Sequence, residues 1–215
     1  METTFIAVRH GQSMANHNKV FAGSREYPLT ALGEAQARET AEYIKDSFSV
    51  DLVVTSPLSR ARRTGQIIAE AVGAPTIVED GLIEIDAGEW EMVPWAELPR
   101  LFPEDRRVWV EDIGRCRCTG GESVAEVYDR VVKALKRLDE LYRGKTVVLA
   151  CHYIPVRSMW CWASGFAAED MAACSHAPEN ASVTVIKLKN GIPEAVEYSI
   201  SKHLVDAGLM PTRIK

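Results

Sequence analysis

Four basic side chains follow apolar runs that have the length of β-strands. They are Arg9 and His10 after residues 4–8, Arg60 shortly after residues 52–55, and His152 after residues 146–151. In open α/β sheets, ligands bind in the crevice outside the carboxyl ends of the strands, so these side chains can converge on one site. The planar guanidinium of arginine matches the oxygens of a phosphate, and a histidine can act as a nucleophile or an acid–base group. The sequence therefore predicts a phosphate-handling centre.

The elements that must position this centre alternate between strands and helices. We expect further strands at 75–78, 182–188 and 195–200, with Asn190-Gly191 as a hairpin turn between the last two. Apolar residues at helical spacing predict helices from Thr30 to about 48 and at about 58–72, 123–142 and 155–165. Ser123 and Glu126 fit a capping box at the start of the third of these helices. The alternation predicts an α/β fold, a three-layer α/β/α sandwich with a mostly parallel sheet.

Residues 86–121 interrupt the alternation. They hold Trp90, Trp95 and Trp109, three prolines and many charges of both signs. We interpret this stretch as a small helical cap inserted into a single domain that spans residues 1–215. The tryptophans either pack the cap together or form an apolar wall over the leaving group, and the sequence leaves both alternatives open.

Composition bounds the classes of protein that remain. The 215 residues are 47% hydrophobic and 26% charged, which is typical of a globular protein with a core. A net charge of −5 disfavours a nucleic-acid partner, which usually requires a basic face. No apolar run approaches the roughly 18 residues that would cross a membrane. Five cysteines at irregular spacing favour reduced thiols and a cytoplasmic location.

Several stretches, in one order along the chain, resemble the motifs of the histidine phosphatase superfamily, which includes the cofactor-dependent phosphoglycerate mutases. They are Arg9-His10-Gly11, Phe21-Ala22-Gly23 with residues 28–33, Ser56-Pro57-Leu58-Ser59-Arg60-Ala61 with Thr64, Leu82-Ile83-Glu84 with Gly88 and Trp90, and Gly120-Gly121-Glu122-Ser123 followed by Cys151-His152. The Arg-His-Gly match alone is short, but the matches together run from residue 5 to about residue 160. Tyr153 departs from the pattern, since glycine often follows the second histidine in this family.

The resemblance implies a phosphohistidine mechanism. His10 would be the nucleophile, and Glu84 would protonate the leaving oxygen and then activate water. These roles fit the chemistry, because an alkoxide is a poor leaving group that needs a positioned acid, and covalent capture splits one difficult displacement into two easier ones. No metal and no cofactor are expected. A solvated acidic loop is the alternative interpretation of Glu84.

The resemblance also implies which residues contact the substrate. The catalytic set on the phosphoryl oxygens would be Arg9, Arg60 and His152, with Asn16, Gly23 and Tyr153 as further substrate-binding residues. Fixed cations stabilise the charge that spreads over a transferring phosphoryl group. For Asn16, the capping of a turn is the simpler alternative.

The substrate class follows from finer similarities. Ile83-Glu84-Ile85-Asp86 and Asn180-Ala181-Ser182 are similar to stretches of metal-independent phosphoserine phosphatases. In those relatives a histidine follows the Ile-Asp pair, whereas this chain has Ala87, and His203 in the C-terminal tail could partly substitute. We expect a phosphatase, a phosphoric monoester hydrolase, that acts on a small phosphorylated metabolite, with phosphoserine as a candidate.

Two other functions stay open at this point. One is a phosphotransferase of the 2,3-bisphosphoglycerate-dependent phosphoglycerate mutase type, which the short chain disfavours. The other is a catalytically silent phosphate-binding module. A homodimer is also left open.

The remaining histidines and cysteines carry simpler interpretations. Cys116-x-Cys118 lacks the two-residue spacer and the second pair of ligands that are usual for zinc. Cys151 lies in an apolar run and is interpreted as a core thiol. His17 and His176 have no motif around them, so we expect them at the surface.

Overall fold

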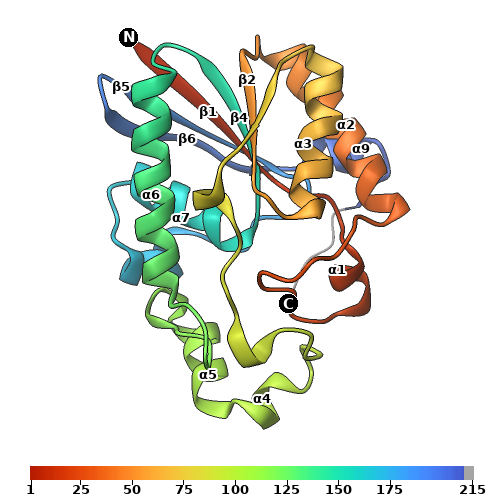
Figure 1. The fold of residues 1–215 in the computed structure, drawn as a ribbon, viewed down its shortest axis with the longest axis vertical. Helices are drawn as coiled ribbons and strands as arrows, with labels where there is room; N and C mark the ends of the chain where they lie inside the picture. The colour runs from red at the N-terminus through yellow and green to blue at the C-terminus, as the bar shows by residue number, and fades with distance from the viewer. Residues whose placement is uncertain (211–215) are drawn as a thin grey trace.

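The sheet at the centre of the computed structural model, which describes residues 1–210, has the strand order β3-β2-β4-β1-β5-β6 (Figure 1). Its strands are β1 (Glu2–Arg9), β2 (Leu52–Thr55), β3 (Thr76–Val78), β4 (Thr146–Cys151), β5 (Val183–Lys189) and β6 (Ile192–Ile200). β1, β2, β3 and β4 pair in parallel, whereas β5 and β6 add an antiparallel hairpin at one side. The expected α/β fold with a mostly parallel sheet is confirmed.

Helices cover both faces of the sheet, as alternate residues of β1 show. Phe5 and Ala7 belong to one apolar cluster, which also contains residues of α6 (Val124–Leu141) and α7 (Tyr153–Ala163). Ile6 and Val8 belong to the other cluster, with residues of α2 (Ala31–Ser47) and α3 (Ser59–Val72). Successive side chains of a strand point to opposite faces, so a strand that is buried on both faces must be apolar throughout.

The helix starts follow the sequence signals. Thr30 Oγ1 accepts a hydrogen bond from the backbone N–H of Gly33 at the start of α2. Ser123 and Glu126 form the predicted capping box of α6. α7 begins at Tyr153, directly after His152 and earlier than predicted. The remaining helices are short: α1 (Met14–Asn18), α4 (Leu98–Leu101), α5 (Pro103–Glu111), α8 (Met171–Cys174) and α9 (Lys202–Asp206).

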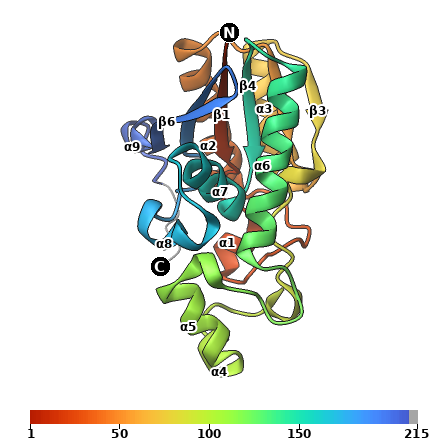
Figure 2. The same ribbon diagram turned by 90° about the vertical axis from the view of Figure 1, so that its left-hand side faces the viewer.

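Residues 86–121 lie outside the sheet, in the connection between β3 and the start of α6. Figure 1 shows α4 and α5 beyond one end of the sheet, opposite the N-terminus, and Figure 2 shows the same arrangement from the side. Aromatic rings join this segment to the rest of the chain, because the Phe21 ring lies 5.4 Å from the ring of Trp90 and 5.2 Å from that of Trp109. Trp90 is fully buried. The segment thus extends over the edge of the sheet where β1 and β4 end.

The expectation that all five cysteine thiols are reduced is wrong. Cys161 of α7 and Cys174 of α8 form a disulfide, with their Cα atoms 6.0 Å apart. The chain between them turns back through a short 3-10 helix and α8, so that α8 lies against α7, which their spacing in the sequence does not reveal. Cys116, Cys118 and Cys151 are free and buried. Burial raises the pKa of Cys116 to about 12. Among residues 1–210, no helix is long and apolar enough to cross a membrane.

Candidate active site

The register of the sheet brings the two predicted histidines side by side. Arg9, the last residue of β1, pairs with Cys151 at the end of β4. His10 and His152 are therefore the first residues beyond two adjacent strands, and their ring centroids lie 5.2 Å apart. The backbone N–H of His10 donates to the carbonyl of Cys151 at 3.0 Å. The sheet itself thus fixes the spacing of these two side chains.

One ring nitrogen of His10 is hydrogen-bonded to a backbone carbonyl, and the other accepts a hydrogen bond from an arginine. Nδ1 lies 2.7 Å from the carbonyl oxygen of Gly11, which can only accept, so Nδ1 carries the proton. Nε2 accepts a hydrogen bond from Nε of Arg60 at 3.3 Å. Burial, reinforced by the charges of Arg60 and Arg9, holds the pKa of His10 well below its usual range. His10 is therefore a neutral imidazole whose unprotonated nitrogen, Nε2, is held beside the Arg60 guanidinium.

Arg60 is seated in backbone carbonyls of the loop after Phe21. Its Nη1 donates to the carbonyl of Arg25 at 2.7 Å, and its Nη2 donates to that of Gly23 at 2.8 Å. Gly23 has a φ of +51°, in the left-handed region that glycine adopts at low cost. Burial lowers the pKa of Arg60 to about 10, which still leaves the guanidinium charged at neutral pH. This fork holds a positive charge beside His10.

Arg9 and His152 each have a buried polar atom without a partner. Arg9 donates through Nη1 to the carbonyl of Pro178 at 2.7 Å, while its Nε meets no hydrogen-bond acceptor among residues 1–210. His152 shares a hydrogen bond with Ser56 through Nε2 at 2.7 Å, while its Nδ1 has no partner within the same range. Buried polar groups are normally paired, so the unpartnered Nε of Arg9, which lines the pocket, indicates a place for a polar ligand.

Glu84 places a carboxyl group against the amino end of α7. Its side-chain oxygens accept hydrogen bonds from the backbone N–H groups of Ile85 at 2.9 Å, Tyr153 at 3.0 Å and Ile154 at 3.3 Å. Burial nevertheless outweighs these donors and raises the pKa of Glu84 above its usual value. A carboxyl group with a raised pKa can hold a proton for transfer, as a general acid must.

These groups meet at a hollow that opens to solvent. Its lining includes the predicted residues Arg9, His10, Arg60, Glu84, Asn16, Gly23 and Tyr153. Arg60 is 1% exposed and His10 is 4% exposed, so the charged groups form the floor of the hollow. His152 does not line it, but is fully buried directly behind His10. The structure thus brings together every predicted site residue.

The three predicted substrate-binding residues also have structural partners. The side-chain oxygen of Asn16 accepts from Ser13 and, at 3.2 Å, from Nδ2 of Asn180, and Asn16 completes the capping box of α1. The carbonyl of Gly23 supports Arg60. The hydroxyl of Tyr153 accepts from Arg157 at 3.1 Å. Asn16 therefore both caps a helix and faces the hollow, so the two interpretations of this residue are compatible.

Some residues of the site were given no definite role by the sequence. Phe21, Trp95 and Trp109 form an apolar wall of the hollow, whereas Trp90 is buried within the packing. Asn180 donates from Nδ2 to the carbonyl of His10 at 2.9 Å, although 170 residues separate them. Phe21 lies in one of the family-like motifs, and the wall was one of two interpretations of the cap tryptophans, whereas Asn180 stood out only as part of a similar stretch.

The other singled-out histidines lie elsewhere. His203 stacks on Tyr43 of α2 with ring centroids 4.6 Å apart and shares a hydrogen bond with Thr40, so it does not replace the histidine that is missing at Ala87. His17 and His176 are exposed. Within the described part of the chain, no group of three or more His, Cys, Asp or Glu residues could hold a metal ion.

Comparison with known proteins gives concordant matches. A sequence model of the histidine phosphatase superfamily (branch 1) matches residues 5–201. Phosphoserine phosphatase 1 of Hydrogenobacter thermophilus is 34% identical over 200 residues, which cover 93% of each chain. A probable phosphoglycerate mutase of Salmonella choleraesuis is 36% identical over 150 residues, 68% of each chain. The solved structure of a histidine-to-alanine variant of phosphoserine phosphatase from Entamoeba histolytica, in complex with phosphoserine, gives a TM-score of 0.80 at 25% identity, over 94% of this chain and 99% of that one.

Proposed function

Because this chain belongs to the histidine phosphatase superfamily, we propose that it hydrolyses small phosphomonoesters through a phosphohistidine on His10. Phosphatase activity itself is supported by the family and by the names of its relatives. The observation that carries the proposal is the state of the His10 ring. Nδ1 is committed to the carbonyl of Gly11, and Nε2 lies beside Arg60 at the floor of the hollow.

In the first step, Nε2 of His10 attacks phosphorus while the bond from phosphorus to the leaving oxygen breaks. Glu84 gives its proton to that oxygen, so the alcohol leaves uncharged. Arg9 and Arg60, which line the hollow, stabilise the charge on the three equatorial oxygens, and His152 packs beside His10. The products are the free alcohol, a phosphorylated imidazole and the Glu84 carboxylate.

In the second step, water attacks the phosphorus of the phosphohistidine. The Glu84 carboxylate accepts a proton from this water as the bond between phosphorus and Nε2 breaks. Inorganic phosphate is released, and His10 and Glu84 return to their starting protonation states. The raised pKa of Glu84 suits both steps, because the group must hold a proton in one and accept a proton in the next.

The test is turnover of para-nitrophenyl phosphate by His10→Ala. We expect a loss of about 10³-fold or more, since the nucleophile is removed. His17→Ala is the matched control, because His17 is an exposed histidine on the following helix. Wild-type protein quenched during turnover is expected to carry one phosphoryl group by mass spectrometry, and His10→Ala is not. A variant His10→Ala with wild-type turnover would show that the mechanism is wrong, and an inactive wild type would favour the silent binding module.

The mutase-type alternative is carried by one of the relatives, the probable phosphoglycerate mutase. A mutase returns the phosphoryl group to a phosphoglycerate, whereas a phosphatase passes it to water. Incubation of 3-phosphoglycerate with a trace of 2,3-bisphosphoglycerate separates the two. Formation of 2-phosphoglycerate faster than inorganic phosphate would support the mutase.

Phosphoserine is the finer proposal for the substrate. It rests on the phosphoserine phosphatases among the relatives. A feature of this chain adds to it: Arg106 of α5 lies over the ring of Trp95 at 5.8 Å, and its buried Nε and Nη1 have no hydrogen-bond partner among residues 1–210. Arg106 lines a second hollow that shares Trp95, Trp109 and Tyr153 with the first. A free guanidinium next to the leaving-group side suits a substrate with a carboxylate.

A screen of phosphoserine, phosphoethanolamine, 3-phosphoglycerate and sugar phosphates tests this substrate class. We expect the highest kcat/KM for the substrates that carry a carboxylate. We also propose that the substrate is a small phosphorylated metabolite, and sedimentation would decide whether the protein is a homodimer.

A further inference from the structure

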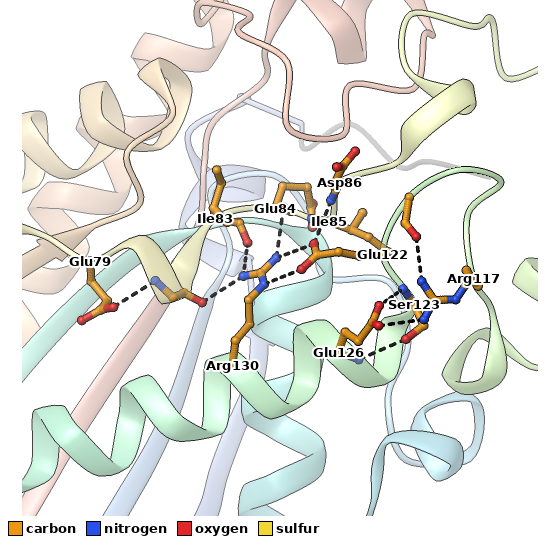
Figure 3. Close-up of polar contacts among 12 residues, drawn as sticks. Glu79, Ile83, Glu84, Ile85, Asp86, Arg117, Glu122, Ser123, Glu126 and Arg130 are labelled. Carbon is orange, nitrogen blue, oxygen red and sulfur yellow. Dashed lines mark hydrogen bonds and ion pairs between the residues drawn. The ribbon is translucent and has the colours of Figure 1, made fainter.

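The loop that carries Glu84 lies in no helix or strand. Residues 83–87 follow a short 3-10 helix, Asp80–Leu82, and precede another, Gly88–Trp90. A catalytic carboxyl group needs a fixed position, and a loop without a backbone ladder must obtain it from other contacts. Figure 3 shows those contacts, which come from residues at the start of α6.

Arg130 of α6 uses all five of its N–H groups on this loop and on one carboxylate. Nη1 donates to the carbonyls of Gly81 at 3.0 Å and Ile83 at 2.7 Å. Nη2 donates to the carbonyl of Glu84 at 3.1 Å, and Nε and Nη2 each donate to Glu122 at 3.1 Å. A guanidinium has five donors in a rigid fork, so this arrangement fixes three carbonyls relative to one another.

Glu122 closes the arrangement from the other side. Besides its paired contact with Arg130, one of its carboxylate oxygens accepts from the backbone N–H of Asp86 at 2.9 Å. Its own backbone N–H donates to the carbonyl of Asp86 at 2.8 Å. The side chains of Arg130 and Glu122 are 22% and 28% exposed, so the pair is largely shielded from water. The loop is therefore held on both sides of Glu84, at Ile83 and at Asp86.

The two ends of Glu84 are held by different elements. Arg130 of α6 binds its backbone carbonyl, and the N–H groups of Tyr153 and Ile154 at the start of α7 bind its carboxyl group. The contacts at α7 orient the carboxyl group but leave the backbone free to shift. We propose that Arg130 and Glu122 are positioning residues that hold Glu84 where its carboxyl group can give a proton to the leaving oxygen of a phosphoryl group under attack by His10. This inference rests on the proposed function, in which Glu84 is the general acid.

A leaving-group comparison tests this inference. The para-nitrophenolate ion leaves without a proton, whereas the alkoxide of an alkyl phosphate such as β-glycerophosphate needs one. We compare kcat/KM, because it reports the steps up to departure of the alcohol and excludes the hydrolysis of the phosphohistidine, which both substrates share. A displaced Glu84 therefore lowers kcat/KM for β-glycerophosphate much more than kcat/KM for para-nitrophenyl phosphate. General loosening of the fold or of the phosphate site lowers both kcat/KM values together. The ratio of the two kcat/KM values is thus specific for the position of the acid.

Arg130→Met keeps the length of the side chain and removes its donors. We expect the ratio, β-glycerophosphate over para-nitrophenyl phosphate, to fall by about 10-fold or more, because a positioned acid contributes about 10²–10⁴-fold. The ratio for Arg130→Lys is expected to lie between those of Arg130→Met and the wild type. Arg117→Met is the matched control, since Arg117 binds Glu126 and the carbonyl of Gly121 at the same helix start without touching residues 81–86. Its ratio is expected to equal that of the wild type.

Two further variants keep the test decisive if Arg130→Met does not fold. Glu122→Gln removes the charge that pairs with Arg130 and is expected to lower the ratio in the same direction. In a Glu84→Gln background, Arg130→Lys is expected to change the ratio by less than about 2-fold, because the acid through which it acts is gone. Thermal unfolding of each variant reports on folding separately.

A wild-type enzyme that turns over both substrates, with variants whose two kcat/KM values fall in equal proportion, would overturn the positioning role and leave the proposed function standing. If Arg130→Lys lowered the ratio in the Glu84→Gln background as much as it does in the wild type, the positioning role would also be overturned. A wild type that hydrolyses neither substrate would instead contradict the proposed function.

Discussion

The floor and the cap of the hollow are built in different ways. The floor residues are Arg9 at the end of β1, His10 directly after it and Arg60 in the first turn of α3. They are almost completely buried and take their positions from backbone hydrogen bonds of the sheet and of one loop. The cap takes its position from Trp90 and Trp109, whose rings pack on Phe21, whereas its ion pairs of Arg107 with Glu104 and Glu111 are exposed and lie within α5. Exposed ion pairs contribute little to stability. The difference suggests that the floor sets the chemistry and that the cap sets the choice of substrate.

Removal of the Arg60 guanidinium tests the floor. Arg60→Met is expected to lower kcat for every phosphomonoester by about 10³-fold, because a fixed donor to the transferring group is lost beside the nucleophile. Steady-state kinetics on para-nitrophenyl phosphate and phosphoserine measure it. Arg62→Met, an exposed neighbour on the same helix, is the control. A loss confined to one substrate would mean that Arg60 selects substrates, as we assign to the cap.

The pH dependence tests the acid that lies between floor and cap. His10 must be neutral to attack, and its lowered pKa keeps it neutral at pH values at which an ordinary histidine is protonated. Glu84 must be protonated, and its raised pKa lets it keep the proton at pH values at which an ordinary glutamate has lost it. Activity on an alkyl phosphate therefore falls as the pH rises through the pKa of Glu84 and falls again as the pH drops through that of His10. Glu84→Gln is expected to lose about 10²-fold on alkyl phosphates together with the alkaline limb.

The control for this pH profile is para-nitrophenyl phosphate, for which both the loss and the alkaline limb are expected to be weaker. An alkyl phosphatase rate that rises steadily into the alkaline range would contradict the role of Glu84.

A change in the cap is expected to have a smaller and selective effect. Arg106→Met is expected to raise KM for phosphoserine by about 10-fold, equivalent to about 1.4 kcal/mol, through loss of a contact to its carboxylate. KM for phosphoethanolamine, which lacks the carboxylate, should stay as in the wild type. Arg107→Met, the exposed neighbour, serves as control. An equal rise of KM for both substrates would contradict the assignment of substrate choice to the cap.

Removal of metal ions is expected to have no effect on either region. The proposed steps use the imidazole of His10, the carboxyl group of Glu84 and two guanidinium groups. Turnover of para-nitrophenyl phosphate after dialysis against EDTA should equal that of untreated protein. Loss of activity that a divalent ion restores would contradict the mechanism.

The same two regions differ in how well the sequence predicts them. The floor is predictable because strand ends in a parallel sheet meet at one edge, so the sequence alone predicts that His10 and His152 converge on one site. The hairpin turn at Asn190-Gly191 was predictable from local turn chemistry, and it joins β5 to β6. Local signals also gave the helix starts at Thr30 and Ser123.

Contacts between distant segments were not predictable. Arg130 is an ordinary charged residue on an amphipathic helix, and nothing in its spacing shows that it reaches Ile83 and Glu84. The pairing of Cys161 with Cys174 likewise depends on the path of the intervening chain. The aromatic wall over the hollow depends on how an irregular segment packs, which no periodicity encodes.

The central position of β1 has a consequence for synthesis of the chain. β1 is built first, yet it pairs with β4 on one side and β5 on the other, both from the second half of the sequence. Asn180, which binds the carbonyl of His10, also lies just before β5. Such long-range pairing slows folding, and during translation it must wait for the later strands to leave the ribosome. A nascent chain released before β5 therefore carries the nucleophile without the site that makes it reactive.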